Sequence, residues 1–393
     1  MSERDSKELA FLYFPGDYRW SMGLMLALGT APWGGAEIDE INRVGQRLRD
    51  KLGDDRAWVA EWTRMARLVE HRGRASNHDR TRAACLLRAA HYYHIGERFL
   101  QPKTEDGLAD YRRGVECFKE AARLIRHTRI EPVEIPYEGK SLPGLLVHAE
   151  TTAPRAPAMV FFDGLDVTKE IQYFHGVPEM AARGIACLIV DGPGNGEAIR
   201  FRGMPLHHET ERYARAAYDF IAGRSEFDAQ RIGVMGISLG GYYAPRAAAM
   251  EPRFACCVAW GAQWDYHAIW KERLERIAQQ QAVALSVAAD HLLWILDART
   301  PAEALKKLEG FRLDGVAQKI RCPFLLVHGE RDAQIPLESA RRLYDAVGSA
   351  RKTLKIFTAE EGGYHHCQVD NATIGVDAIC DWLEEVLQPA AAL

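Results

Sequence analysis

The spacing of hydrophobic residues differs between the N-terminal third of the chain and the rest. Between residues 37 and 127, apolar residues recur every three or four positions, as on the buried face of a helix. Clear examples are Ile38, Ile41, Val44 and Leu48, then Trp58, Trp62 and Met65. From residue 133 onward, short apolar runs alternate with helical stretches. This change predicts an N-terminal helical cap domain over residues 1–130 and a second domain over residues 131–393.

Eight short runs in the second domain are candidate strands: 133–137, 143–148, 158–162, 186–190, 231–235, 255–260, 323–328 and 353–357. Their alternation with helices is typical of an α/β fold with a mostly parallel sheet. We expect the first two runs to pair as an antiparallel hairpin at the start of that sheet.

The longest interval between candidate strands predicts an insertion. About sixty residues separate Trp260 from the strand at 323, more than a single crossover helix needs, so we expect a helical lid over about 264–318. Trp264, Tyr266, His267 and Trp270 follow a strand's carboxyl end, where α/β sheets bind ligands. These residues are candidates to line a pocket for a flat, ring-containing substrate, and the alternative is that they form the core of the lid.

A nucleophile motif lies at the end of the fifth candidate strand. Residues 236–240 read Gly-Ile-Ser-Leu-Gly, a G-x-S-x-G motif followed by a small-residue helix. A serine at a sharp strand-to-helix turn needs neighbours that are almost free of side chain, which Gly236 and Gly240 provide. Ser238 is therefore the candidate nucleophile of an α/β-hydrolase fold.

An acid and a histidine follow in the chain order that this fold requires. Asp332 lies in the polar loop after the strand at 323–328, and the loop after the last strand contains His365 and His366. Only one of these adjacent histidines can face the serine, and the residues alone do not decide between them. The alternative is an ordinary turn aspartate and a solvated histidine loop.

The turn after the strand at 158–162 is the candidate oxyanion loop. Backbone N–H groups near Leu165 or Asp166 would act with that of Leu239, the residue after the serine. A plain glycine turn is the alternative.

Three motifs resemble the α/β-hydrolase family of 2,6-dihydroxypseudooxynicotine hydrolase, which is related to the fermentation-respiration switch proteins and to fungal polyketide-shortening hydrolases. They are Gly363-x-x-His366-Cys-Gln, Gly164-Leu-Asp-x-Thr-Lys-Glu170 and Asp191-Gly-Pro-Gly-x-Gly-Glu197. The resemblance implies that His366 is the general base and that the N-terminal domain covers the active site. It also implies cleavage of a carbon–carbon bond next to a carbonyl group.

The same resemblance draws attention to Asp166, where relatives are thought to carry a catalytic glutamate. A carboxyl group beside an oxyanion hole would have a raised pKa and would serve as an acid or as an anchor for a substrate hydroxyl. The alternative is that Asp166 caps the helix that begins near Thr168.

Aromatic residues, methionines and glycines also gather near the N-terminus, in segments 11–16 and 20–25. A stretch of this kind suits the roof of an apolar pocket or a dimer contact.

Composition fits a soluble enzyme. The 393 residues are 47% hydrophobic and carry a net charge of −4, so no basic surface for nucleic acid is expected. We find no apolar run long enough for a membrane and no signal-peptide core, and we expect a cytoplasmic homodimer. The eight cysteines show no zinc-like spacing, and residues 192–196 lack the pattern of a nucleotide-binding loop, so no metal and no cofactor is implied.

These observations predict a serine hydrolase with a Ser238–Asp332–His366 triad that acts on an apolar or aromatic carbonyl compound. The alternatives are an ester or thioester hydrolase, an acyltransferase or cyclase with the same triad, and a non-catalytic regulatory protein. An intact triad argues against the last of these.

Overall fold

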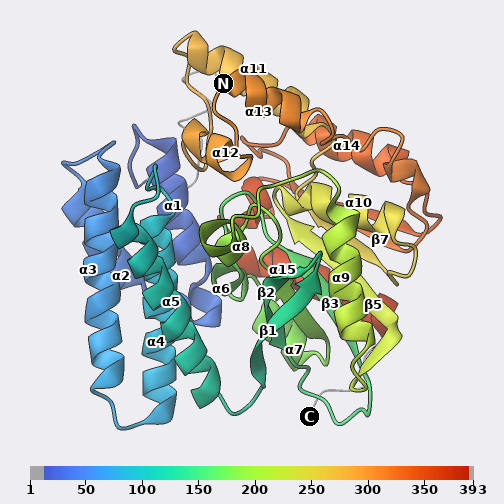
Figure 1. Cartoon of the computed structure of the whole chain (residues 1–393), viewed down its shortest axis with the longest axis horizontal. Coiled ribbons are helices and arrows are strands. Elements are labelled where there is room, and N and C mark those ends of the chain that lie inside the picture. Colours follow the sequence, from blue (N-terminus) through green and yellow to red (C-terminus); the bar gives the residue numbers. More distant parts are fainter. Residues whose placement is uncertain (1–12, 389–393) are drawn as a thin grey trace.

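The computed structural model describes residues 13–388 and has the predicted α/β architecture (Figure 1). Its eight-stranded sheet has the order β1-β2-β4-β3-β5-β6-β7-β8. The strands are β1 Ile130–Tyr137, β2 Lys140–Val147, β3 Ala156–Phe162, β4 Ala186–Val190, β5 Phe227–Ile237, β6 Cys257–Trp260, β7 Phe324–Gly329 and β8 Lys352–Phe357. All eight predicted strands are present.

Strand pairing also follows the sequence-based prediction. β1 and β2 form an antiparallel hairpin, β2 pairs antiparallel with β4, and every later pair is parallel. β3, β4, β6 and β7 are buried along their whole length, because helices cover both faces of the sheet. Their near-continuous apolar runs made them visible in the sequence.

Two sets of helices cover the sheet. One face carries α9 (Thr210–Ala222), α10 (Gly240–Met250) and α14 (Leu337–Ala346), and the other carries α7 (Val177–Ala182) and α15 (Ala372–Leu387). Two short helices, α6 (Lys169–Gln172) and α8 (Gly196–Arg202), follow the carboxyl ends of β3 and β4.

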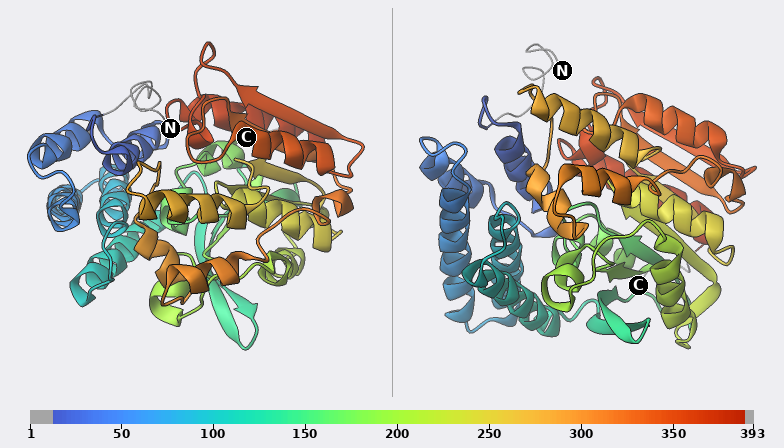
Figure 2. Two further views of the ribbon diagram at one scale, coloured as in Figure 1. Left: turned by 90° about the horizontal axis from the view of Figure 1, so that it is seen from above. Right: turned by 45° about the horizontal axis from the view of Figure 1, so that its top comes forward.

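Five helices precede the sheet and lie together along one side of it (Figures 1 and 2). They are α1 Tyr18–Gly29, α2 Ile38–Leu48, α3 Asp55–Arg74, α4 Asp79–Glu97 and α5 Glu105–Leu124. The predicted stripe residues Trp58, Trp62 and Met65 are fully buried between these helices, whereas Ile38, at the start of α2, is 74% exposed. The helical spacing of apolar residues therefore identified this region correctly, but it did not show that Ile38, at the first turn of α2, lies outside the core.

The predicted insertion between β6 and β7 contains α11 (Tyr266–Ala278), α12 (Ala289–Ile295) and α13 (Pro301–Leu308). These helices lie above the sheet in Figure 1, on the same side as the loops that follow β3, β5 and β7. Ser238, Asp332 and the candidate oxyanion residues lie in those loops, and His366 lies in the loop after β8. The insertion and the N-terminal helices enclose these candidates from two directions.

Candidate active site

Ser238 lies at the turn between β5 and α10, with a left-handed backbone at φ 58°. A non-glycine residue there is strained and needs close surroundings that hold it. Gly236 permits this turn, because a Cβ atom at that position would lie 2.3 Å from the carbonyl oxygen of Gly240. The strand-turn-helix context that the motif requires is therefore present.

Ser238, His366 and Asp332 form one hydrogen-bonded chain. His366 Nε2 lies 2.8 Å from Ser238 Oγ, and its Nδ1 lies 2.7 Å from Asp332 Oδ2. The other oxygen of Asp332 accepts the backbone N–H groups of Gln334 and Ile335 at 2.8 and 2.9 Å. The three side chains come from separate loops that follow β5, β7 and β8.

The charges around these three side chains raise the pKa of the His366 imidazole. Burial opposes charge on His366, but the Asp332 carboxylate outweighs it and raises the pKa of His366 well above its usual range. Burial would raise the pKa of Asp332, but His366 and the backbone N–H of Ile335 lower it. A carboxylate at Nδ1 favours the tautomer with its proton on Nδ1, in which Nε2 can accept a hydrogen bond from the Ser238 hydroxyl.

The structure separates the two adjacent histidines. His366 faces Ser238, whereas the ring of His365 packs against Tyr364 at a centroid distance of 4.2 Å and its backbone N–H donates to Asp370. Cys367 Sγ lies 3.7 Å from the Trp260 carbonyl oxygen and 3.5 Å from His366 Nε2.

The loop after β3 approaches the serine closely. A Cβ atom at Gly164 would lie 3.1 Å from the Cβ atom of Ser238. Leu165 follows Gly164, and Leu239 stands at the N-terminus of α10. The backbone of the loop is held by Asn195 Nδ2, which donates to Gly164 O at 2.6 Å, and by His291 Nε2, which donates to Leu165 O at 3.2 Å.

Asp166 does not cap a helix. The N-cap of α6 is Thr168, and the buried Asp166 carboxylate instead accepts hydrogen bonds from Nε and Nη2 of Arg98, with Nε at 2.9 Å. The helix-cap alternative is therefore wrong. Arg98 lies at the C-terminal end of α4, so this ion pair joins the helical domain to the loop beside Ser238. The catalytic role of Asp166 stays a prediction.

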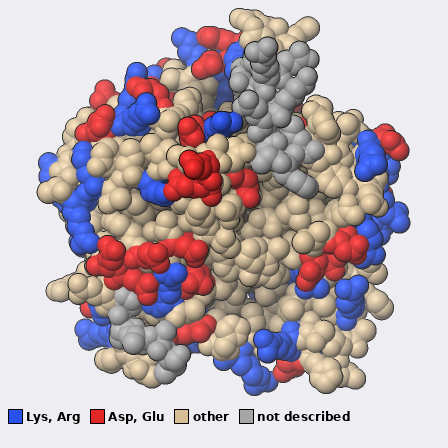
Figure 3. Space-filling view, turned by 180° about the vertical axis from the view of Figure 1, so that it is seen from behind, with Lys and Arg blue, Asp and Glu red and all other residues tan. Residues whose placement is uncertain are grey.

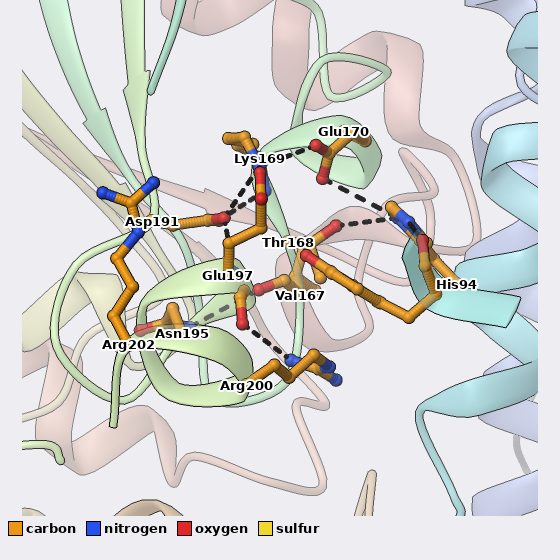
Figure 4. A network of polar contacts seen from close by, with 12 residues as sticks. His94, Val167, Thr168, Lys169, Glu170, Asp191, Asn195, Glu197, Arg200 and Arg202 are labelled. Atoms are coloured by element: carbon orange, nitrogen blue, oxygen red, sulfur yellow. Dashed lines mark hydrogen bonds and ion pairs between the residues drawn. The ribbon is translucent and has the colours of Figure 1, made fainter. Parts of the chain in front are cut away.

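A buried ion cluster lies next to the same loop (Figure 4). Lys169 Nζ contacts carboxylate oxygens of Asp191 at 2.9 Å and of Glu170 and Glu197 at 2.7 Å each. His94 of α4 joins it through Thr168, with 3.1 Å between His94 Nδ1 and Thr168 Oγ1. The motifs at 164–170 and 191–197 are thus tied together by one ammonium group.

Replacing the Lys169 ammonium group should destabilise the folded protein. We expect Lys169→Met to reduce the free energy of unfolding by about 3–5 kcal/mol, because it leaves two buried carboxylates, Asp191 and Glu170, and the partly exposed Glu197 without their cation. Urea unfolding measures this, with Lys306→Met on exposed α13 as the control. A change below about 1 kcal/mol for Lys169→Met would contradict the account of the cluster.

A cavity opens over Ser238 and His366. Its surface is mostly apolar, although half of the described residues that line it are polar: Met22, Leu26, Arg98, Gly164, Asp166, Val167, His175, Ile237, Ser238, Ser286, Gln334, His366, Cys367 and Val369. A small-molecule site has this combination of apolar surface and polar groups. Sequence reasoning missed Arg98, His175 and Gln334, which lie in no motif and reach the site only through tertiary packing.

The segment 20–25, which suits the roof of an apolar pocket, contributes Met22 of α1 to this lining, and Leu26 of the same helix, just outside that segment, lines it too. Phe11 and Leu12, from the same prediction, lie outside the described residues.

The four aromatic candidates lie elsewhere. None of Trp264, Tyr266, His267 and Trp270 is among the described lining residues of the cavity. Tyr266 and Trp270 are buried inside the insertion, where Tyr266 packs against Trp270 and Phe311. His267 contacts Arg312 at 2.8 Å near the surface. The arrangement favours the alternative for Tyr266 and Trp270, a role in the core of the lid.

The surface face in Figure 3 carries acidic and basic side chains side by side, with uncharged areas between them. Within residues 13–388, no helix is both long and apolar enough to cross a membrane. The homodimer and the cytoplasmic location stay predictions.

Comparisons with known proteins agree with this fold. A hydrolase of Aspergillus aculeatus is 27% identical, over 95% of this chain and 98% of its own. The 20-hydroxy-prefusarin hydrolase of Gibberella moniliformis is 28% identical, over 94% and 97%. The 2,6-dihydropseudooxynicotine hydrolase of Paenarthrobacter nicotinovorans is also 28% identical, over 90% and 91%.

A solved structure of 2,6-dihydroxy-pseudo-oxynicotine hydrolase superposes with a TM-score of 0.76 at 24% identity, covering 93% of this chain and 98% of that one. The resemblance stated from the three motifs is thus confirmed, as is the fold. The family model of FrsA-like esterases matches residues 46–388. The chain belongs to the FrsA-like esterase family and is an α/β-hydrolase enzyme.

Proposed function

We propose that the enzyme is a serine hydrolase in which Ser238 is the nucleophile, His366 the general base and Asp332 the residue that orients His366. The observation that carries this proposal is the continuous chain of 2.8 and 2.7 Å contacts from Ser238 Oγ through His366 to Asp332. The left-handed turn at Ser238 supports it, because it presents the hydroxyl at the edge of the sheet.

The reaction follows from this arrangement. His366 Nε2 takes the Ser238 proton while Oγ attacks the substrate carbonyl carbon. Backbone N–H groups of Leu165 and Leu239 receive the oxyanion, and each such donor contributes about 3 kcal/mol of transition-state stabilisation. Protonated His366 then supplies the proton that the leaving group needs, and water hydrolyses the acyl-enzyme by the same route.

We propose that the bond cut is a carbon–carbon bond next to a carbonyl group, as in a 1,3-diketone or a polyketide side chain. The resemblance to the 2,6-dihydroxypseudooxynicotine hydrolase family implies such a cleavage and supports this choice, since the 2,6-dihydropseudooxynicotine hydrolase is 28% identical over 90% of this chain. The apolar lining of the cavity also suits an apolar or aromatic carbonyl compound. Ester hydrolysis is the second candidate, because the matching family model is described as an esterase.

Two substrates with the same acyl group separate the candidates. Dibenzoylmethane and p-nitrophenyl benzoate both leave a benzoyl group on Ser238, and they differ only in the group that departs. We expect the enzyme to release acetophenone and benzoate from dibenzoylmethane, as measured by chromatography. Turnover of the ester alone would overturn the carbon–carbon assignment and support the esterase.

A further inference from the structure

Three polar side chains of the cavity lining are almost fully buried: Arg98, His175 and Gln334. These residues are only 3, 6 and 8% exposed. Gln334 has a hydrogen-bond partner in Tyr18 and His175 has one in the backbone of Ile171, whereas Nη1 of Arg98 has no partner in the described structure. A buried donor without a partner destabilises the fold, so this donor at the cavity is best explained by a ligand that pairs with it.

Arg98 is held in a fixed orientation. Its Nε and Nη2 are held by Asp166, which fixes the plane of the guanidinium group and leaves Nη1 as the donor without a partner. Asp166 directly follows Leu165 in the oxyanion loop, so Arg98 is anchored next to the residues that surround the scissile carbonyl group. A guanidinium group donates strong hydrogen bonds to anionic oxygen.

We propose that Arg98 is a catalytic residue that binds the second oxygen of a 1,3-dicarbonyl substrate and stabilises it as the leaving enolate. The inference rests on the proposed function. When Ser238 Oγ bonds to the first carbonyl carbon, the bond to the central carbon breaks and its electron pair moves onto the second oxygen, which Arg98 Nη1 holds. The central carbon then takes the proton that His366 removed from Ser238, and water later releases the acid from the acyl-enzyme.

The test removes the Arg98–Asp166 pair as a unit. Arg98→Met/Asp166→Leu avoids an unpaired buried carboxylate, and Arg19→Met/Asp55→Leu, which removes a bidentate pair that does not line the cavity, is the matched control. Melting curves verify that each variant folds. Three quantities are measured in each: kcat/KM for dibenzoylmethane, kcat/KM for p-nitrophenyl benzoate, and the inhibition constant of dimedone, a cyclic 1,3-diketone that is an enolate at neutral pH.

We expect the Arg98 double variant to lower the diketone-to-ester ratio of kcat/KM by about 10- to 100-fold and to weaken dimedone inhibition by a similar factor. The control should change neither value. Equal losses for both substrates with unchanged dimedone inhibition would show a purely structural role and overturn the proposal. If the wild-type enzyme cleaves only the ester, the carbon–carbon assignment fails, and dimedone binding alone then decides whether Arg98 holds an enolate.

Discussion

Ser238→Ala is expected to lower kcat for p-nitrophenyl benzoate by about 10⁴- to 10⁶-fold, while KM stays nearly constant. The serine oxygen forms the acyl-enzyme, so its loss removes the covalent route and leaves only the oxyanion donors and substrate binding. The folded structure should survive, because alanine replaces a small side chain whose main contact is with His366. Initial rates followed by p-nitrophenolate absorbance measure the effect.

The control for this variant is Ser225→Ala, in an exposed loop before β5. It should retain wild-type kcat. A Ser238→Ala enzyme that keeps more than about a tenth of wild-type activity would mean that water or another residue attacks the substrate.

Asp332→Asn is expected to lower kcat/KM by about 10³- to 10⁴-fold and to move its acidic limb to lower pH. In the wild-type enzyme the activity needs neutral His366, so it is lost as the pH falls through the pKa of this residue. Asp332 raises that pKa and burial lowers it. Removing the carboxylate leaves burial, the largest influence, opposed by Cys367 but no longer by Asp332, so the pKa of His366 falls and the acidic limb moves to lower pH. The asparagine amide also favours the wrong tautomer of the ring.

The pH profile of kcat/KM for the ester measures this shift. Asp345→Asn, an exposed substitution at the end of α14, controls for the loss of one negative charge and should leave the limb in place. If the acidic limb of Asp332→Asn stays at the wild-type pH, then Asp332 does not determine the pKa of the general base, and the account is contradicted.

The sequence was sufficient for the fold because each buried strand is a short apolar run between polar turns. β4 and β7 have every residue buried, and both were predicted within one residue of their bounds. The helical region was visible from its period, but Ile38 shows that periodicity alone does not identify which apolar residue is covered.

The candidate site was only partly predictable. The three triad candidates each follow a strand, in the chain order that the α/β-hydrolase fold requires: Ser238, Asp332 and His366. This order can be read directly from the sequence. Arg98 and His291 reach the loop after β3 from the cap and the insertion, so their place depends on how distant helices pack. Trp264 and Trp270 follow the end of a strand, where pocket residues are often found. Trp270 is nevertheless buried in the core of the insertion and does not line the cavity.

Labelling with a fluorophosphonate probe tests the central claim, that Ser238 is the nucleophile activated by His366 and Asp332. Peptide mass mapping of the labelled wild-type enzyme should place the adduct on Ser238, and the natively folded Ser238→Ala variant should take up no label. An adduct on another residue, or a folded wild-type enzyme that remains unlabelled, would contradict the account.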